Sequence, residues 1–323
     1  MKSTVIAGRL AAAILLFGAA SSAASATTIL FVGNSFTYGE TAGATGPTVQ
    51  GYQPGSVTDL NRTNVGGVPA LFKQFTIDLG LDYTVSLETV AGTGLDYHYT
   101  NKLGLINQAW DKVVLQSYST LDAGNPGNPG KLITYTGLLA DALHAQNPAV
   151  DIFLDATWSR ADLTYKTASP WLGQPIDAME KAVQAGYEQA AASTPYVKGV
   201  IKVGAAWNSA FDTGLADLNP YDGIDPGKIN LWAPEGYHAS PYGYYLEALM
   251  EFGQITGLDP RLLGANEAAA ASFRFTPEQT SALQDIAYNQ LNNVPEPSTL
   301  MLMASAAGAL AYGRRRKRAA SAT

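Results

Sequence analysis

Residues 27–39 read Thr-Thr-Ile-Leu-Phe-Val-Gly-Asn-Ser-Phe-Thr-Tyr-Gly and open with a short run of β-branched and apolar residues that stops at Gly33. Such a run predicts a buried β-strand over 28–32, and the glycine predicts the turn that ends it. Asn34 and Ser35 then lie at the carboxyl end of the strand, where open α/β sheets place their ligand sites. Ser35 has small polar neighbours and is a candidate nucleophile, which requires a general base.

The base must come from one of three histidines: His98, His144 and His238. His238 lies in a Gly- and Pro-rich segment that precedes a predicted helix, and Glu235 stands three residues before it. This spacing lets the carboxylate hold one imidazole nitrogen while the other nitrogen faces the serine, as in a catalytic triad. A neutral base is needed, so we expect the rate to rise with pH across the range in which histidine titrates. Asp222 and Asp225 are alternative acids. His144 ends a predicted helix, where the helix dipole and solvent explain it.

At these residues the sequence resembles the SGNH or GDSL hydrolases. Residues 33–37, Gly-Asn-Ser-Phe-Thr, are similar to the family's GDS block with Asn in place of Asp, and residues 235–238 are similar to its closing Asp-x-x-His block with Glu in place of Asp. The resemblance implies a secreted-type serine esterase in which Ser35 is the nucleophile, His238 the base and Glu235 the orienting acid. The blocks occur in the family's order between residues 27 and 255.

A glycine block contributes to the oxyanion hole in this family. Residues 91–95, Ala-Gly-Thr-Gly-Leu, resemble that block. Gly92 is the better match and Gly94 the alternative. The resemblance implies that the backbone N–H groups of Ser35 and Gly92 receive the oxyanion.

A side-chain amide completes the oxyanion hole of the family. Residues 113–117, Val-Val-Leu-Gln-Ser, follow a predicted strand and fall where the family has its Gly-x-Asn-Asp block. The Asn of that block is absent, so the resemblance assigns the amide donor to Gln116 or to Asn34. One such donor is typically worth about 3 kcal/mol, and replacement of Gln116 is expected to slow turnover without abolishing it.

Strands and helices alternate along the rest of the chain. Alternating and apolar runs predict five strands, at 28–32, 83–90, 112–116, 150–156 and 196–203. Helical spacing predicts helices at 68–79, 102–109, 132–146, 175–193, 204–210 and 240–253, and a last helix that starts at 276–278. This order predicts an α/β fold, a three-layer α/β/α flavodoxin-like sandwich with a five-stranded, mainly parallel sheet. Residues 38–66 predict a long loop that shapes a substrate cleft.

Three further features bear on ligands. His98, among tyrosines, is a candidate substrate contact, although a structural histidine that hydrogen-bonds within the fold is favoured there. Trp158, at the end of the fourth strand, is also a candidate substrate contact. The acidic residues between 211 and 233 do not follow the EF-hand spacing, and a solvated loop is favoured over a calcium site there. The sequence has no cysteine, which excludes disulfides and thiolate metal sites. We expect no metal and no cofactor.

Both ends of the chain carry targeting patterns. Residues 1–26 combine two basic residues, an apolar run and a final Ala-Ser-Ala, which predicts a signal peptide cleaved after Ala26. Residues 295–323 begin Pro-Glu-Pro-Ser, continue with an apolar run and end in a basic cluster, 314–318. This layout resembles the PEP-CTERM sorting signal and implies processing by an exosortase in a Gram-negative bacterium. A plain signal anchor at either end is the alternative.

The domain between them, 27–294, has a composition typical of a globular protein, because the whole chain is 46% hydrophobic and only 15% charged. The net charge of the chain is −7, and removal of both terminal segments takes away mostly basic residues. An acidic domain argues against nucleic acid as a partner. We expect signal peptidase and an exosortase-type enzyme as processing partners, transient membrane insertion of the C-terminal segment, and a final location at the cell surface or in the extracellular matrix.

The function predicted from these features is hydrolysis of esters, with O-acetylated or otherwise acylated carbohydrate as the preferred substrate class. No Gly-x-Ser-x-Gly elbow is present, which argues against an α/β-hydrolase. Two alternatives stay open. One is a non-catalytic surface protein that binds glycan, and the other is an acyltransferase that uses the same serine with a sugar as acceptor.

Overall fold

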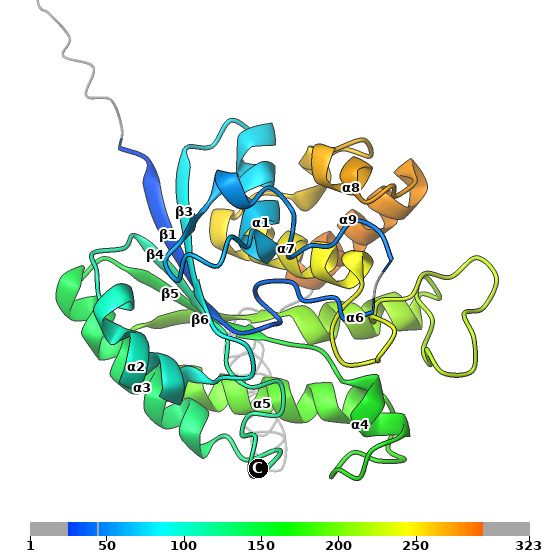
Figure 1. Cartoon of the computed structure of the whole chain (residues 1–323), viewed down its shortest axis with the longest axis horizontal. Helices are drawn as coiled ribbons and strands as arrows, with labels where there is room; N and C mark the ends of the chain where they lie inside the picture. The colour runs from blue at the N-terminus through cyan, green and yellow to red at the C-terminus, as the bar shows by residue number, and fades with distance from the viewer. Residues whose placement is uncertain (1–24, 44, 293–323) are drawn as a thin grey trace, which may run out of the picture.

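The computed structural model describes residues 25–43 and 45–292, and in them a six-stranded sheet lies between two layers of helices (Figure 1). The strands are β1 (Thr27–Gly33), β2 (Thr58–Asp59), β3 (Tyr83–Thr89), β4 (Lys112–Leu115), β5 (Asp151–Ala156) and β6 (Val197–Lys202). The predicted signal peptide and C-terminal sorting segment fall almost wholly outside the described residues. The three-layer α/β fold expected from the sequence is confirmed.

All strand pairs of the sheet are parallel, in the order β2-β3-β1-β4-β5-β6. Without the short β2, this is the 2-1-3-4-5 order of flavodoxin-like folds. β1 is central and pairs with β3 on one side and with β4 on the other, Phe31 opposite both Leu87 and Val114. The chain therefore changes direction across the sheet at β1, and a ligand site is expected at the carboxyl end of this strand.

Alternate residues of β1 enter two separate cores, one on each face of the sheet. Ile29 and Phe31 pack against the layer that contains α1 (Gly67–Asp78), α6 (Val203–Asp212), α7 (Pro241–Thr256) and α9 (Pro277–Asn292). Leu30 and Val32 pack against α2 (Leu95–Ile106), α3 (Gly130–Gln146) and α5 (Asp177–Ala192). A strand buried on both faces reads as a continuous apolar run, which is why β1 shows no polar alternation.

Helix α7 is mostly buried and begins three residues after His238. Ser240 caps it, accepting a hydrogen bond from the Gly243 N–H at 3.4 Å, and Pro241 occupies its first position. Gly257 ends the helix in the left-handed conformation, φ 72°. These signals fix where α7 starts, and so they fix the position of the histidine loop before it.

The structure differs from the prediction at four places. The sheet has six strands instead of five, because the segment 38–66 contains β2 and a 3-10 turn, η1 (Pro54–Ser56). Helix α2 begins at Leu95, not at 102, so the predicted boundary was wrong. A short helix, α4 (Ala161–Tyr165), follows β5. Beyond α7, a 3-10 turn, η2 (Pro260–Leu263), and α8 (Ala268–Ser272) precede α9.

Glu180, on α5, is a buried carboxylate that should make stability depend on pH. It is 4% exposed, and burial raises its pKa from 4.5 to about 7, although Asn208 donates a hydrogen bond to it at 2.8 Å. Between these two pH values the unfolded chain has released its proton while the folded chain keeps it, so stability falls as pH rises.

We expect Glu180→Gln to remove this decrease of stability with rising pH. Relative to the variant, the wild-type free energy of unfolding should decrease by about 3 kcal/mol between pH 4.5 and 7, then stay constant. Urea denaturation at several pH values measures the difference. The same change in the free energy of unfolding with pH in both proteins would contradict the prediction.

Candidate active site

Ser35 lies in a tight turn directly after β1. The chain ends the strand at Gly33, where a side chain would collide with Thr37, 2.0 Å from its Oγ1. The turn is closed by hydrogen bonds from the Tyr38 N–H to the Asn34 carbonyl and from the Glu40 N–H to the Ser35 carbonyl, both 3.0 Å. This turn holds the Ser35 side chain at the carboxyl edge of the sheet, with 3% of the residue exposed.

His238 reaches the same edge from a compact loop between residues 232 and 239. An isolated β-bridge pairs the two ends of this loop, and the Ala233 N–H donates to the His238 carbonyl at 2.8 Å. Gly236 turns the chain with φ 73°, and a side chain there would lie 2.1 Å from the Tyr221 hydroxyl. That hydroxyl donates to the Glu235 carbonyl at 2.8 Å. The loop is therefore fixed on both sides of the histidine.

The three residues form a continuous relay of hydrogen bonds. The Nε2 of His238 lies 2.9 Å from the Oγ of Ser35, across 203 positions of sequence. The Nδ1 of His238 lies 2.7 Å from the Oε1 of Glu235, which also accepts the His238 backbone N–H at 3.2 Å. Since an ionised carboxylate only accepts, this partner assigns the proton to Nδ1 and leaves Nε2 free to accept from the serine.

Aromatic rings hold the imidazole in place. The ring of Tyr237 stacks on that of His238 with a centroid distance of 4.1 Å, and Phe36 lies 5.5 Å away. The guanidinium of Arg160 lies 3.6 Å from the Tyr237 ring centroid, and Asp162 accepts two hydrogen bonds from that guanidinium. The imidazole is thus packed as well as hydrogen-bonded, which limits its rotation.

Two backbone N–H groups are available beside the serine. Within the described part of the chain, the N–H groups of Ser35 and Gly92 donate no hydrogen bond. Gly92 lies in the exposed turn after β3, the neighbouring strand of β1, and has φ 67°. At Gly94 a side chain would lie 2.4 Å from the Tyr118 ring, and the Gly94 N–H likewise donates no hydrogen bond to a described residue. The hydrogen bonds therefore do not distinguish Gly92 from Gly94 as the second donor.

The two candidate side-chain amides are already engaged. The Oε1 of Gln116 accepts the Asn34 N–H at 2.9 Å and the Thr37 hydroxyl at 3.1 Å, and its Nε2 donates to the Ser117 carbonyl. The Nδ2 of Asn34 donates to the carbonyls of Thr93 at 2.8 Å and Ser117 at 3.1 Å. Both amides join the serine turn to the neighbouring loops and position it. The Asn34 Nδ2 uses both of its N–H groups, whereas the Gln116 Nε2 has one N–H group with no partner among the described residues.

We therefore expect Gln116→Met, which keeps the length but not the hydrogen bonds, to destabilise the protein as well as slow it. The variant leaves the buried Asn34 N–H unpaired, a cost of about 1–3 kcal/mol in the free energy of unfolding. Denaturation and kcat are measured together. A fall in kcat at unchanged stability would instead identify Gln116 as an oxyanion donor.

His98 forms internal hydrogen bonds, as the favoured interpretation of the sequence has it, and the alternative of a substrate contact is not supported. The side chain is fully buried, with Nδ1 2.5 Å from Glu88 and Nε2 3.1 Å from the Thr93 hydroxyl. Thr93 in turn donates to the Val90 carbonyl at 2.7 Å. His98 lies on α2, which begins at Leu95, and its bond to Thr93 supports the glycine turn from inside the protein. The buried side chain is not positioned to contact substrate.

Trp158 is also placed beneath the site. It is fully buried, stacks on Trp207 with a centroid distance of 4.5 Å, and packs against Phe36 at 4.6 Å. Its Nε1 donates to the Tyr237 carbonyl at 3.4 Å. Trp158 therefore packs against Phe36 and bonds Tyr237, the neighbours of Ser35 and His238 in the sequence. The prediction that it touches substrate is not supported.

The acidic segment between residues 211 and 233 is a folded loop held by its own backbone. Asp217 accepts the N–H groups of Asn219 at 2.9 Å and Asp225 at 2.8 Å. Asp222 accepts the Asn219 side chain, and Asp225 pairs with Lys228, each at 2.8 Å. These partners account for the carboxylates of the loop, and they are different from the partner of His238.

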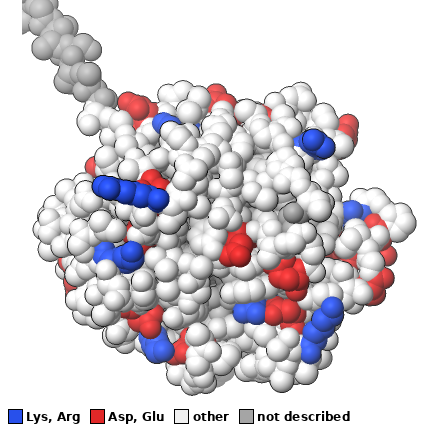
Figure 2. All heavy atoms as spheres, viewed as in Figure 1, with Lys and Arg blue, Asp and Glu red and all other residues white. Residues whose placement is uncertain are grey.

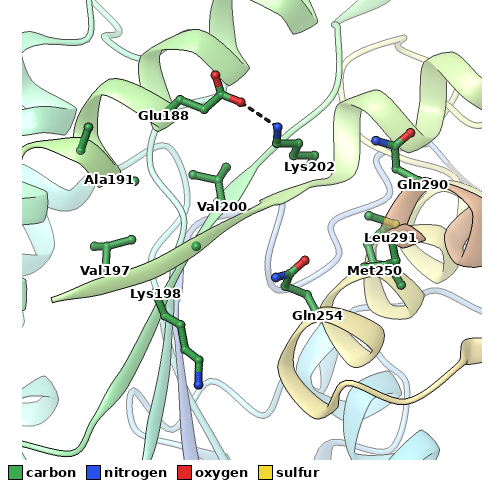
Figure 3. Close-up of a pocket in the computed structure, with 12 residues that line it drawn as sticks. Glu188, Ala191, Val197, Lys198, Val200, Lys202, Met250, Gln254, Gln290 and Leu291 are labelled. Carbon is green, nitrogen blue, oxygen red and sulfur yellow. Dashed lines mark ion pairs between the residues drawn. The ribbon is translucent and has the colours of Figure 1, made fainter. Parts of the chain in front are cut away.

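A cavity of about 430 Å³ opens beside the glycine turn. It is lined by Ala91 next to Gly92, by the aromatic rings of Tyr38 and Tyr97, and by polar side chains of the segment 38–66 that include Asn61. This segment was expected to shape a cleft, and its residues do line this one. A second groove, about 480 Å³, runs along β6 toward α9 (Figure 3). The lining of neither cavity includes Ser35, Glu235 or His238.

Basic and acidic side chains are interspersed on the face drawn in Figure 2. Where the chain is described, no helix has the length and apolar character needed to cross a membrane. The C-terminal apolar segment predicted to insert transiently lies outside those residues.

The fold has a solved counterpart. A DUF4886 family protein from Bacteroides uniformis matches with a TM-score of 0.54 and 15% identity, over 83% of this chain and 95% of that one. The two chains share a fold. A protein described as a GDSL-like lipase from Parabacteroides merdae matches with a TM-score of 0.45 and 16% identity over 72% of this chain and 95% of that one. An acetylxylan esterase from Geobacillus stearothermophilus gives 0.46 and 16% over the same shares.

Residues 293–317 match the PEP-CTERM protein-sorting motif. The predicted C-terminal signal is thereby confirmed, and it indicates export and a cell-surface or extracellular location in a Gram-negative bacterium. No curated protein sequence matches the chain.

Proposed function

We propose that the protein is an exported serine esterase that hydrolyses acyl esters of carbohydrate, O-acetyl groups above all. The observation that carries this proposal is the relay from the Ser35 hydroxyl through His238 to Glu235, with distances of 2.9 and 2.7 Å. A nucleophile, a base and an acid in hydrogen-bonding contact are the arrangement that acyl transfer requires.

The reaction would proceed through an acyl-enzyme. As the Ser35 oxygen attacks the carbonyl carbon, its proton passes to Nε2 of His238, and Glu235 stabilises the imidazolium. Collapse of the tetrahedral intermediate breaks the ester bond, and His238 returns the proton to the departing alcohol. Water, deprotonated by the same imidazole, then releases the acid and frees the serine.

The charge on the tetrahedral intermediate would be received by backbone donors. We assign this role to the N–H groups of Ser35 and Gly92, which donate to no other group among the described residues. Donors fixed in a turn are already oriented when the charge develops, which is why each contributes strongly to the rate. Gln116 and Asn34 would act indirectly by holding the serine turn.

The substrate class rests on location and on the neighbouring cavity. Two tyrosine rings, the Gln50 amide, threonine side chains and Lys102 line the 430 Å³ cavity beside Gly92. The amide of Asn61, also in the lining, is already bonded to Glu88, to the Thr89 carbonyl and to Lys102. Flat aromatic faces with amide groups suit a neutral, hydroxyl-rich ligand, and export places the protein among surface polysaccharides. Maturation would remove both terminal segments, through signal peptidase and an exosortase-type enzyme.

The test is an assay of the purified protein with nitrophenyl acetate and with an O-acetylated polysaccharide, beside Ser35→Ala. We expect acetate release by the wild type from both substrates. Equal rates for the two proteins would leave only a non-catalytic role. Transfer of the acetyl group to an added sugar in place of water, seen by mass spectrometry, would reassign the protein as an acyltransferase.

A further inference from the structure

Three carboxylates meet inside the protein between β5 and α7, away from the relay. Asp155 comes from β5, and Glu247 and Glu251 lie one turn apart on α7. One carboxylate oxygen of each lies within 4.8 Å of the other two. Asp155 and Glu247 are 0% exposed and Glu251 is 1% exposed. The cluster is therefore part of the core, unlike the acidic side chains of the surface.

The oxygens of this cluster have no partners. Both oxygens of Asp155, both of Glu247 and the Oε2 of Glu251 are buried and form no hydrogen bond to any described residue. None of the ion pairs among the described residues includes these side chains. Burial of unpaired carboxylates is costly, so their charge must be compensated by protons or by a cation.

The other buried acid groups of the chain do have partners, which sets this cluster apart. Glu88 accepts from Asn61 at 2.8 Å and bonds His98, and Glu267 accepts the backbone N–H groups at the start of α8. Glu180 accepts from Asn208. Only in the cluster do several fully buried oxygens point at one another with no donor between them in the described structure.

The spacing of the oxygens fits a cation. A point equidistant from three oxygens that lie within 4.8 Å of one another is at most about 2.8 Å from each, and a slight contraction reaches the 2.3–2.6 Å of Ca²⁺–oxygen bonds. Carboxylates are hard ligands that select Ca²⁺ or Mg²⁺. Mg²⁺ binds at 2.0–2.1 Å and usually keeps several waters, whereas these side chains have almost no exposed surface.

We propose that Asp155, Glu247 and Glu251 bind one calcium ion that joins α7 to the sheet. The ion would act through position. Tyr244, one turn before Glu247, donates its hydroxyl to the Glu40 carbonyl at 2.7 Å and to the Ser35 carbonyl at 3.3 Å. A fixed α7 thus supports the serine turn, and the inference does not depend on the esterase proposal.

The test compares the thermal unfolding of the purified protein in EGTA and in millimolar calcium. We expect calcium to raise the Tm by about 5 °C or more, EGTA to reverse the shift, and calorimetry to give one ion per chain. Magnesium should give a smaller shift. Tm and stoichiometry are used because neither requires catalytic activity.

The variants Asp155→Asn and Glu247→Gln, singly and combined, keep the shape of the core and remove charge. In EGTA they should melt at or above the wild-type temperature, and in calcium they should show no shift. Glu180 is a buried carboxylate outside the cluster, so Glu180→Gln should show the same calcium-dependent rise in Tm as the wild type. Absence of calcium binding by the wild type would overturn the proposal. So would a rise in Tm of the combined variant equal to that of the wild type, which would indicate an ion in the loop of Asp217 and Asp225.

Discussion

Ser35→Ala is expected to lower kcat for ester hydrolysis by at least about 10⁴-fold, with KM little changed. The hydroxyl forms the covalent intermediate, so its loss removes the whole acyl-enzyme route, and only binding and the backbone donors remain. The alanine side chain lacks only the hydroxyl oxygen, and the backbone of the turn is held by Gly33, Asn34 and Gln116. Circular dichroism and Tm should therefore match the wild type.

A fluorophosphonate probe gives a second readout of the same prediction. The wild type should gain the mass of one phosphonyl group on the peptide that contains Ser35, and the alanine variant should gain none. Ser117→Ala is the matched control, because Ser117 is also buried at this edge of the sheet, where its hydroxyl accepts the Leu95 N–H at 3.3 Å. Labelling of another residue, or a similar fall in kcat for the control, would count against Ser35 as nucleophile.

Local signals in the sequence were sufficient to predict the central strand and the pairing of the triad residues. The run 28–32 and Gly33 define β1 by composition alone, and the three-residue spacing of Glu235 and His238 is that of one turn. Contact between Ser35 and His238 required the parallel topology as well, which follows from the alternation of strands and helices.

Other features could not be predicted because they depend on packing. Gln116 occupies a family donor position, but its side-chain oxygen accepts from Asn34 and Thr37 and its Nε2 donates to the Ser117 carbonyl, contacts that follow from the register of β1 and β4. His98 was a possible substrate contact because it follows the glycine block, and the helix start was expected at 102. The start at Leu95, after an extended Gly94, turned the imidazole inward.

The buried carboxylates left no local signal either. Asp155 ends an apolar strand and resembles a site residue at the sheet edge, while Glu247 and Glu251 lie in a helix rich in apolar residues and resemble an ordinary polar stripe. Only the packing of α7 on the sheet shows that all three point to one place. Asp155 and the two glutamates form no recognisable sequence motif, unlike the Ser35 and His238 blocks, so the sequence does not indicate that they meet.

The acid of the relay is the part of the proposed mechanism that the sequence left open among Glu235, Asp222 and Asp225. Glu235→Gln is expected to lower kcat by about 10²–10⁴-fold. The glutamine oxygen can still accept from Nδ1 of His238, so the ring stays oriented, but the charge that stabilises the imidazolium is lost. Structure and substrate binding should be nearly unaffected, since 29% of the Glu235 side chain is exposed.

The matched controls are Asp222→Asn and Asp225→Asn. The Asp222 carboxylate accepts from Asn219 and the Asp225 carboxylate pairs with Lys228, so neither contacts His238. Both variants should keep kcat within about twofold of the wild type. The NMR signal of the proton on Nδ1 of His238 gives an independent measurement. This downfield signal should change position in Glu235→Gln and keep its position in both controls. A loss of activity in Asp225→Asn equal to that in Glu235→Gln would transfer the orienting role to the loop aspartate, because only the true partner of the imidazole changes the energy of its protonated form.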